Sequence, residues 1–209
     1  MSSSSSLVVP MLMWGRRPPT HCITVLYLLR DQRTLVTGGG DGQVLLWEVD
    51  VDRGKDDAAA RSPSWSITPR HMLVGHTAPV RCVAKASAGQ DCHHIVTTSE
   101  NGEMFTWDTV DGRALESRRY PNHVHTTIQA YRTPETAHVK LFCCGFYEEI
   151  VVMEPFSLEI LFQLSSRHNS DWVSSFHVLR PRNRNDDVIL ALTTTGTVKV
   201  WTLGEDDER

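Results

Sequence analysis

The stretch TLVTGGGDGQVLLWEV (Thr34 to Val49) decides the fold. It joins two apolar segments through a run of glycines and the pair Asp41-Gly42. Glycine-rich loops can cradle phosphates, but a P-loop needs Gly-Lys-Ser/Thr and a dinucleotide loop needs GxGxxG, each at the start of a helix. Here Gln43 stands in the place of the last glycine, and a strand-like segment follows. The stretch therefore indicates two strands joined by a tight turn, with no cofactor.

The same pattern returns along the chain. A β-rich apolar segment, a turn that ends in glycine and an alternating segment that ends in tryptophan recur at Gly42 and Trp47, at Gly102 and Trp107, and at Gly196 and Trp201. A degenerate copy, LFCCGFYEEIVVMEP (Leu141 to Pro155), has Glu148 in the glycine place and Met153 in the tryptophan place. The four anchors at 47, 107, 153 and 201 lie 60, 46 and 48 residues apart. The longest interval contains a polar, turn-rich segment, Asp52 to Pro69, which we interpret as a loop insertion.

A period near 45 residues, with glycine turns between short strands, is typical of the blades of a β-propeller. Both residues of an Asp-Gly or Asn-Gly pair can take positive φ, which suits a tight hairpin. Alternation in GTVKVW places Val198 and Val200 on one face of a strand, with Lys199 and Trp201 on the other. We therefore predict an all-β protein, a partial β-propeller of about four blades. Each hairpin, the inner part of its blade, should pack its aromatic anchor against the neighbouring blade.

The repeats divide the chain into segments. We expect an N-terminal segment with a candidate ring-closing strand (1–15), a first blade (16–52), the loop insertion (53–70), a second blade (71–118), a degenerate third blade (119–164), a fourth blade (165–204) and an acidic tail (205–209). Four blades seldom close a ring, and stacked repeats need their neighbours to bury both faces. We expect an open ring, hence a fragment with an exposed sheet face.

Composition limits which classes of function remain for the chain. The chain of 209 residues has 40% apolar residues and a net charge of −4, which gives no general attraction to nucleic acid. The five cysteines form no CxxC pair, and CHH (Cys92 to His94) lacks a second ligand pair, so we expect reduced thiols, no metal site and a cytoplasmic location. No apolar run approaches the roughly 20 residues that span a bilayer. Any association with membranes would therefore come through partners.

VGHTAPVRCVA (Val74 to Ala84) precedes the second copy of the pattern, and here the chain resembles the WD-repeat family. In such blades a His, a Ser or Thr, an Asp and the Trp form a buried hydrogen-bonded set. The resemblance places this set at His76, Thr97, Asn101 and Trp107 in the second copy, and at His21, Thr37, Asp41 and Trp47 in the first. The other structural positions that it implies are Gly42, Gly75, Gly102, Asp108, Gly196 and Trp201. Asn101 departs from the pattern because it provides no carboxylate, so the second set should be weaker.

A narrower resemblance covers most of the chain. LMWGRRPPTHCIT (Leu12 to Thr24), NGEMFTWDTVDGRALE (Asn101 to Glu116), FSLEILF (Phe156 to Phe162), SDWVSS (Ser170 to Ser175) and TTGTVKVW (Thr194 to Trp201) are similar, in order, to the N-terminal propeller of the rabconnectin-3 beta family, also called the WD-repeat-containing protein 7 family. Its members are long, non-catalytic scaffolds. The resemblance implies that, with a rabconnectin-3 alpha partner, the protein regulates the vacuolar proton pump on vesicles and endosomes. The alternative is an adaptor in endocytic sorting.

Catalytic patterns are weak in this sequence. There is no GxSxG elbow, and the neighbouring carboxylates of Glu148 and Glu149 would point to opposite faces of a strand, so we expect no enzyme. We expect interaction surfaces instead, at the insertion with Trp65, at PNHVH (Pro121 to His125) and at RHNSDW (Arg167 to Trp172). Trp65 either anchors a partner, as Trp commonly does at interfaces, or folds back onto its own blade. Both alternatives remain open from the sequence.

Overall fold

Strands alone make up the regular structure of the part of the chain that the computed structural model describes, residues 22–52, 64–87, 93–132, 138–166, 170–182 and 186–203. The first sheet comprises β1 (Ile23–Leu28), β2 (Thr34–Gly39), β3 (Val44–Asp52) and β4 (Ser64–Leu73). The second comprises β5 (Val80–Lys85), β6 (His94–Ser99), β7 (Glu103–Asp108) and β8 (Ala114–Arg119). The third comprises β9 (His125–Arg132), β10 (Val139–Gly145), β11 (Ile150–Met153) and β12 (Ile160–Leu164). The fourth comprises β13 (Val173–Leu179), β14 (Asp187–Thr193) and β15 (Val198–Leu203).

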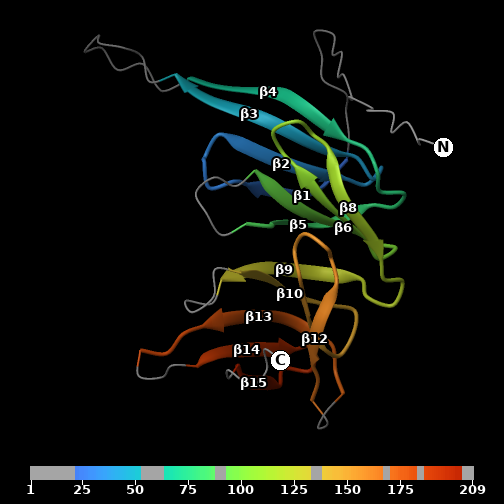
Figure 1. Cartoon of the computed structure of the whole chain (residues 1–209), viewed down its shortest axis with the longest axis vertical. Helices are drawn as coiled ribbons and strands as arrows, with labels where there is room; N and C mark the ends of the chain where they lie inside the picture. The colour runs from blue at the N-terminus through green and yellow to red at the C-terminus, as the bar shows by residue number, and fades with distance from the viewer. Residues whose placement is uncertain are drawn as a thin grey trace, which may run out of the picture.

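Each sheet is an antiparallel meander in which neighbouring strands follow one another along the chain. The sheets succeed each other along the longest axis of the molecule, from the first at the top to the fourth at the bottom (Figure 1). The first strands β1, β5, β9 and β13 contact one another in that order, as the inner strands of propeller blades do. The four blades do not close into a ring, so the predicted partial β-propeller is confirmed. In the described ranges, no helix has the length and apolarity needed to cross a membrane.

The repeated glycines form the turns between the second and third strands of their blades. Gly42, Gly102 and Gly196 have φ angles of 81°, 79° and 86°, which only glycine adopts without strain. Asp41 and Asn101 do not share the positive φ that we expected for both residues of each pair. The hairpins that these turns close occupy the two middle strands of each four-stranded blade rather than its inner edge, because another strand precedes each of them.

The predicted loop insertion, 53–70, is longer than the loop in the structure. The structure begins β4 at Ser64, inside the segment 53–70, and pairs it with β3 as far as Leu73. The segment was misleading because it contains a proline, which removes a backbone donor. Pro69 is tolerated here because β4 is an edge strand and the register shifts at Leu46/Trp47, opposite this residue. The first blade therefore extends to Leu73, and the second begins at β5 rather than at residue 71. The candidate ring-closing strand in 1–15, His21 and the tail 205–209 lie outside the described residues.

Three hydrophobic cores hold the four blades together, one at each interface. The first core joins β2 and β3 of the first blade to Val80, Ile95 and Trp107 of the second. A Cβ atom on Gly38 would lie 2.6 Å from Cγ1 of Val80, so this glycine permits the close approach of the two blades. The second core joins the second and third blades, and the third core joins the third and fourth. One face of the first blade and one face of the fourth are left at the ends of the stack.

Candidate functional site

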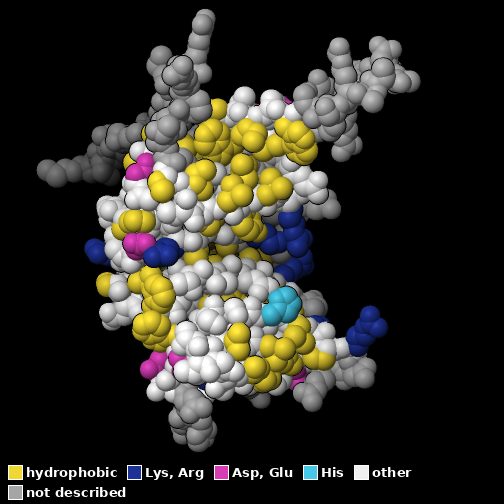
Figure 2. Space-filling model, turned by 180° about the vertical axis from the view of Figure 1, so that it is seen from behind, with side chains coloured by type: hydrophobic (Ala, Val, Ile, Leu, Met, Phe, Trp, Pro, Cys, Tyr) yellow, Lys and Arg dark blue, Asp and Glu magenta, His cyan; other side chains and the backbone are white. Residues whose placement is uncertain are grey.

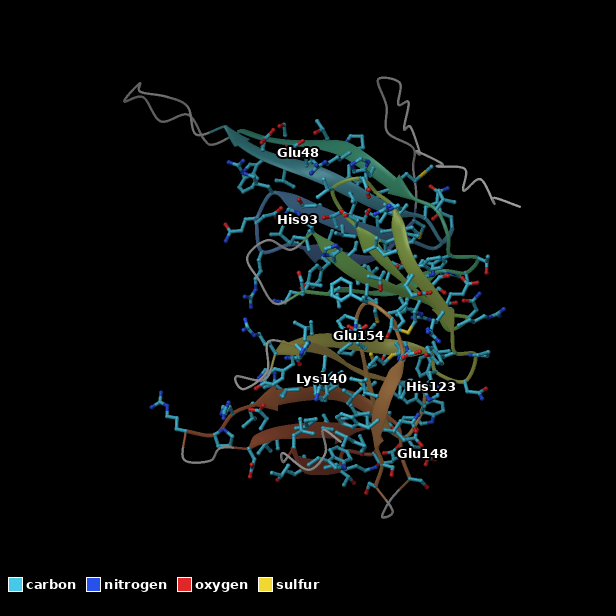
Figure 3. All side chains as sticks on the ribbon, in the orientation of Figure 1. Glu48, His93, His123, Lys140, Glu148 and Glu154 are labelled. Carbon is cyan, nitrogen blue, oxygen red and sulfur yellow. The ribbon has the colours of Figure 1, made fainter. Side chains whose placement is uncertain are left out.

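One edge of the blades gathers the turns and the entry segments; we call it the turn rim. It consists of the turns between the second and third strands of each blade and the segments that lead into β5, β9 and β13. The turn at Gly42 touches the segment before β5, because a Cβ atom there would lie 2.6 Å from the carbonyl oxygen of His76. The turn at Gly102 accepts a hydrogen bond from the backbone of Tyr120, before β9, at 2.8 Å. The rim includes the side of the molecule where His123 and Glu148 lie (Figure 3).

A buried hydrogen-bonded chain supports this rim at the second blade. The indole Nε1 of Trp107 donates to Oγ1 of Thr97 at 2.8 Å, and Nε2 of His76 lies 2.7 Å from the same hydroxyl. Burial lowers the pKa of His76 to about 4, although the nearby carboxylate of Glu103 acts in the opposite direction. The neutral imidazole also packs edge-on against Phe105, with ring centroids 4.7 Å apart. Three of the four residues that the family resemblance placed in this set lie together.

Asn101, the fourth member of that set, does not reach His76. Its Oδ1 accepts hydrogen bonds from Ser99 and from the backbone of Glu103, and its Nδ2 donates to Oγ1 of Thr77 at 2.9 Å. The carboxylate next to the histidine comes from Glu103, whose Oε2 lies 3.7 Å from Nδ1 of His76. The turn at Gly102 directs this next residue toward the entry segment. The signal for this position in the sequence is an acidic residue directly after the turn glycine, Glu103 after Gly102.

Glu103 also fastens the entry segment to the turn. Its carboxylate accepts hydrogen bonds from the backbone and the hydroxyl of Thr77, at 2.7 and 2.6 Å. Burial opposes ionisation, but these bonds outweigh it and hold the pKa of Glu103 below its ordinary value. In the fourth blade, Asp171 of the entry segment makes the corresponding link to Thr194 and Thr195 of the turn. In the second blade the carboxylate lies directly after the turn, and in the fourth blade it lies in the entry segment. In both blades it links the turn to the entry segment along the turn rim.

The other WD-repeat positions that the resemblance implied lie in the turns and in the packed interior of the blades. Trp47 donates from Nε1 to Oγ1 of Thr37 at 2.8 Å, as Trp107 does to Thr97, and Asp41 accepts from the backbone of Gln43 within its turn. Gly75 lies against the rings of Phe105 and Trp107, where a Cβ atom would come within 2.9 and 3.0 Å of ring carbons. Asp108 accepts from the backbone of Val110 at 2.7 Å, at the end of β7. Trp201 is partly buried and packs against the core between the third and fourth blades.

The most exposed aromatic feature of the rim is a pair of rings, Phe146 and Trp172. Phe146 lies in the turn between β10 and β11, and Trp172 lies in the entry segment of β13. Their ring centroids are 5.5 Å apart, and the two side chains are 49% and 48% exposed. The loop of Trp172 is a candidate surface from the sequence, but Phe146 is not, because the third blade lacks the glycine turn that marks the other blades.

Buried neighbours hold Phe146 in place. Tyr147, the next residue, is buried and its hydroxyl lies 2.7 Å from Nδ1 of His125. Burial, with His123 adding to the effect, lowers the pKa of His125 to about 3, so this imidazole is neutral at ordinary pH. Because Tyr147 points inward and is fixed, the preceding side chain is presented outward. In the segment Pro121 to His125, His125 is therefore buried beneath this surface, whereas Pro121 and Asn122 are exposed.

Trp65 lies away from the turn rim, at the start of β4 and opposite Val51 of β3. Its side chain is 65% exposed, so it does not fold back into its own blade. Ile67, two residues further along the same strand, is also exposed and lies on the same face. The two side chains form an apolar strip at the outer edge of the first blade.

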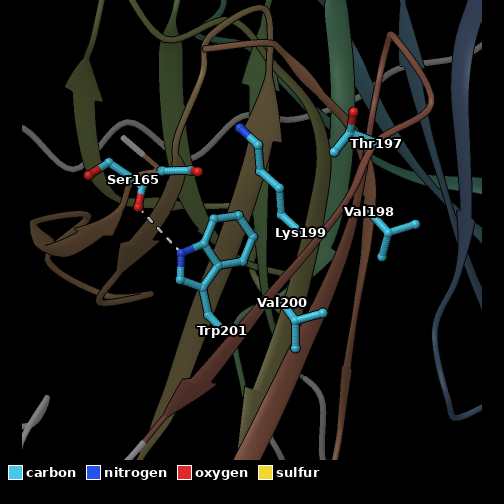
Figure 4. A pocket seen from close by; sticks show the side chains of 7 residues that line it. Ser165, Thr197, Val198, Lys199, Val200 and Trp201 are labelled. Atoms are coloured by element: carbon cyan, nitrogen blue, oxygen red, sulfur yellow. Dashed lines mark hydrogen bonds between the residues drawn. The ribbon is translucent and has the colours of Figure 1, made fainter. Parts of the chain in front are cut away.

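The described residues offer little acid–base or metal chemistry. They contain no cluster of three or more His, Cys, Asp or Glu side chains arranged to hold a metal. A pocket of about 300 Å³ lies along β15 (Figure 4) and is lined by Ser165, Ser166, Thr197, Val198, Lys199, Val200 and Trp201. Its lining has hydroxyls and one amine but no carboxylate, imidazole or thiol. Burial raises the pKa of the Cys82 thiol to about 11, which removes it as a nucleophile at neutral pH.

Comparison with known proteins agrees with this geometry. Residues 67–108 match the family described as WD domain, G-beta repeat. This segment holds the His76, Thr97 and Trp107 chain together with its turn. The chain contains a WD40 repeat.

Its sequence is homologous to WD repeat-containing protein 72 of Mus musculus, with 32% identity over 91% of this chain, and to the Homo sapiens protein of the same name, with 31% identity. This WD40-repeat chain spans only 16% of the length of either relative.

Solved structures share the fold at low identity. The beta-propeller domain of Cps50 (Swd1) from Myceliophteria thermophila superposes with a TM-score of 0.59 at 14% identity, over 88% of this chain and 53% of that one. The computationally designed Ika4 protein superposes with a TM-score of 0.58 at 15% identity, over 96% of this chain and 100% of that one. At these identities, the likeness shows the propeller fold alone.

Proposed function

We propose that this WD40-repeat protein is a non-catalytic scaffold that binds other proteins through its turn rim. The observation that carries the proposal is the exposed pair Phe146 and Trp172, held outward by a buried tyrosine and histidine. Interface anchors are enriched in large aromatic residues that a rigid frame presents at little entropic cost. The carboxylate links of Glu103 and Asp171 supply that rigidity along the rim.

The process we propose is the regulation of vesicle acidification. The protein would bind a rabconnectin-3 alpha-like partner and subunits of the vacuolar proton pump, and would lie in the cytoplasm at vesicle or endosome membranes through those partners. Support comes from the ordered sequence resemblance to the rabconnectin-3 beta family, from the first blade to β15. WD40 domains in general mediate protein–protein interactions, which agrees with the proposed role.

The test compares tagged wild-type protein with a Phe146→Ala/Trp172→Ala double variant. The matched control is Leu161→Ala, which removes an exposed apolar side chain from β12, an outer strand. Proteins recovered after gentle purification are quantified by mass spectrometry. We expect the wild type and the control to recover proton-pump subunits, and the double variant to recover at least about tenfold less, since anchor truncations cost 2 kcal/mol or more.

Two failures are distinguishable. Equal recovery by the double variant would show that the turn rim does not bind these partners. Recovery of endocytic sorting proteins by the wild type, with no proton-pump subunits, would overturn the role in acidification and support the adaptor function instead.

A further inference from the structure

A basic residue recurs near the end of the first strand of every blade. In each blade, one residue of the first strand pairs in line with the anchor position of the third strand: Leu28, Lys85, Ala130 and Val178. The first, third and fourth blades carry an arginine two residues further along, whereas the second blade carries its lysine at the pairing residue itself. We call these four residues the basic track: Arg30, Lys85, Arg132 and Arg180.

The basic track crosses the blades at the edge opposite the turn rim, because every first strand begins at the rim and ends at that edge. The first strands contact one another in order, and packed sheets lie about 10 Å apart, so the four residues span about 30 Å. β9 and β13 point to the left in Figure 1, and Figure 2, seen from behind, shows Lys and Arg side chains gathered in a recess at the right. Arg30 and Arg132 are exposed, and Lys85 and Arg180 are half-buried.

Asp31, the carboxylate that follows Arg30, faces its own turn. It accepts hydrogen bonds from the backbone of Arg33 and of Thr34, both at 2.9 Å, and from the hydroxyl of Thr34 at 2.6 Å. Burial opposes ionisation, but these bonds outweigh it and lower the pKa of Asp31 below its ordinary value. The Asp31 carboxylate is therefore committed to the start of β2.

The fourth blade contributes a weaker positive charge to the basic track. The side chain of Asp187 is buried beside Tyr131, whose pKa burial raises to about 12, and Arg180 lies close enough to affect the same hydroxyl. Asp186, the preceding residue, is exposed at the same edge. Because these carboxylates offset part of the charge of Arg180, we expect the exposed arginines of the first and third blades to contribute more.

The outer half of the same edge is acidic. The residue directly after the anchor position is Glu48, Asp108 or Glu154 in the first three blades. Neighbouring strands lie about 4.8 Å apart, so the third strands lie about 10 Å outside the first strands that carry the basic track. Exposed aromatic rings at this edge, Trp65 and Phe156, also belong to its outer half, at the start of β4 and in the loop before β12.

This division of charge favours a narrow anionic ligand. A flat anionic membrane would face the outer carboxylates as well as the basic track. Single-stranded nucleic acid is typically held by aromatic rings beside the basic groups, and here the exposed rings lie on the outer half of the edge. An extended polypeptide rises about 3.3 Å per residue, so about three residues span one blade and about ten span the whole track.

We propose that the basic track binds an extended segment of a partner protein that is rich in Asp and Glu. The guanidinium groups suit this ligand, because their fork of donors matches a carboxylate in a bidentate geometry. The track lies on the opposite edge from Phe146 and Trp172, so it is a second binding surface, independent of the turn rim. A blade added at either end of the stack would lie beside the track, since the track is on an edge of the sheets.

The test measures the binding of labelled decaglutamate to the wild-type protein by fluorescence anisotropy at low ionic strength. Like charges along this peptide repel one another and keep it extended. Arg30→Glu/Arg132→Glu alters the basic track. The matched control is Arg70→Glu/Arg119→Glu, which makes the same change of net charge at exposed arginines of the outer strands β4 and β8. Circular dichroism checks that both variants keep the strand content of the wild type.

We expect the wild type and the control to bind decaglutamate with the same affinity within about twofold, and the track variant to bind at least about tenfold more weakly. Arg180→Gln should cause a smaller loss, because neighbouring carboxylates already offset this charge. Pentaglutamate, which spans about half of the track, should bind the wild type at least about tenfold more weakly than decaglutamate. Phe146→Ala/Trp172→Ala should bind decaglutamate as the wild type does, so a failure of the turn-rim function is distinguishable from a failure of this proposal.

Each contrary result overturns a stated part of the proposal. A wild type that does not bind decaglutamate, or equal binding by the track variant, would exclude the basic track as a site for acidic segments. An equal loss in the control would show attraction to net charge alone. Pentaglutamate or inositol hexakisphosphate that binds as tightly as decaglutamate would show a site for a compact anion. Tighter binding of oligothymidylate or of phosphatidylserine vesicles would replace the polypeptide with a nucleic acid or a membrane.

Discussion

The second and fourth blades carry the same repeat, but only the second is covered on both sides. On the second blade, Trp107 packs against the first blade, and Val96 and Met104 pack against the third. On the fourth blade, Trp201 packs against the third, while Val198 and Val200 remain exposed. The comparison shows that the repeat specifies two apolar faces per blade whether or not a neighbour is present. Exposed valines on β15 therefore indicate a missing neighbour, not a strand adapted to water.

The strongest way to break this comparison is to truncate corresponding positions. Leu46→Ala should destabilise the protein by about 3 kcal/mol, because it opens a cavity in the core between the first two blades. Val200→Ala, at the matching position of the fourth blade, should change the stability of the isolated chain by less than about 0.5 kcal/mol. Urea unfolding at high dilution measures both. Similar losses from the two substitutions would contradict the equivalence of the faces.

Acid should weaken the second blade through its buried histidine. Burial lowers the pKa of His76 to about 4, so between pH 6.5 and 4 the unfolded chain binds a proton that the folded chain does not. Stability therefore falls as the pH decreases through this window, by about 2 kcal/mol between pH 7 and 5. His125, whose pKa burial lowers to about 3, acts in the same direction.

The measurement is the urea midpoint at a series of pH values from 7 to 5, above the range in which ordinary carboxylates titrate. His76→Gln should flatten the dependence on pH, whereas Gln163→Ala, an exposed position on β12 without an ionisable group, should leave it unchanged. If the urea midpoint of His76→Gln depends on pH as strongly as that of the wild type, His76 does not cause the loss of stability in acid.

The hydroxyl of Thr97 should make a smaller contribution. Thr97→Val keeps the shape of the side chain but leaves Nε1 of Trp107 and Nε2 of His76 without their common partner. Orphaning buried polar groups costs about 1 to 3 kcal/mol. Thr68→Val, an exposed position on β4, is the matched control and should be neutral in thermal unfolding. A neutral Thr97→Val would mean that the hydrogen-bonded chain contributes nothing to the blade.

Much of the fold could be predicted because the turn chemistry is local. The glycine five residues before each tryptophan marks the hairpins of the first, second and fourth blades, and all three glycines take positive φ. The first part of β4 was predicted as loop, because Pro69 and the polar residues around it are typical of a loop. A proline at a register shift on an edge strand leaves no such local sign.

The candidate site was harder to predict, because its geometry depends on contacts between blades. The resemblance located His76, Thr97 and Trp107, but it assigned the acidic position to Asn101 instead of Glu103. Phe146 stands in a turn without the repeat pattern, so nothing in its neighbourhood distinguished it. Alternation in β15 correctly grouped Val198 with Val200, but periodicity states only which residues share a face. Whether another blade covers that face depends on the chain's neighbours.

Hydrogen exchange tests the comparison of the second and fourth blades most directly, because it reports on each blade separately. Amide exchange in β6 and β7 of the second blade, which the chain itself covers on both sides, should be slow. Exchange in β15, where Val198 and Val200 are exposed, should be markedly faster. Equal protection of the two blades would contradict the account.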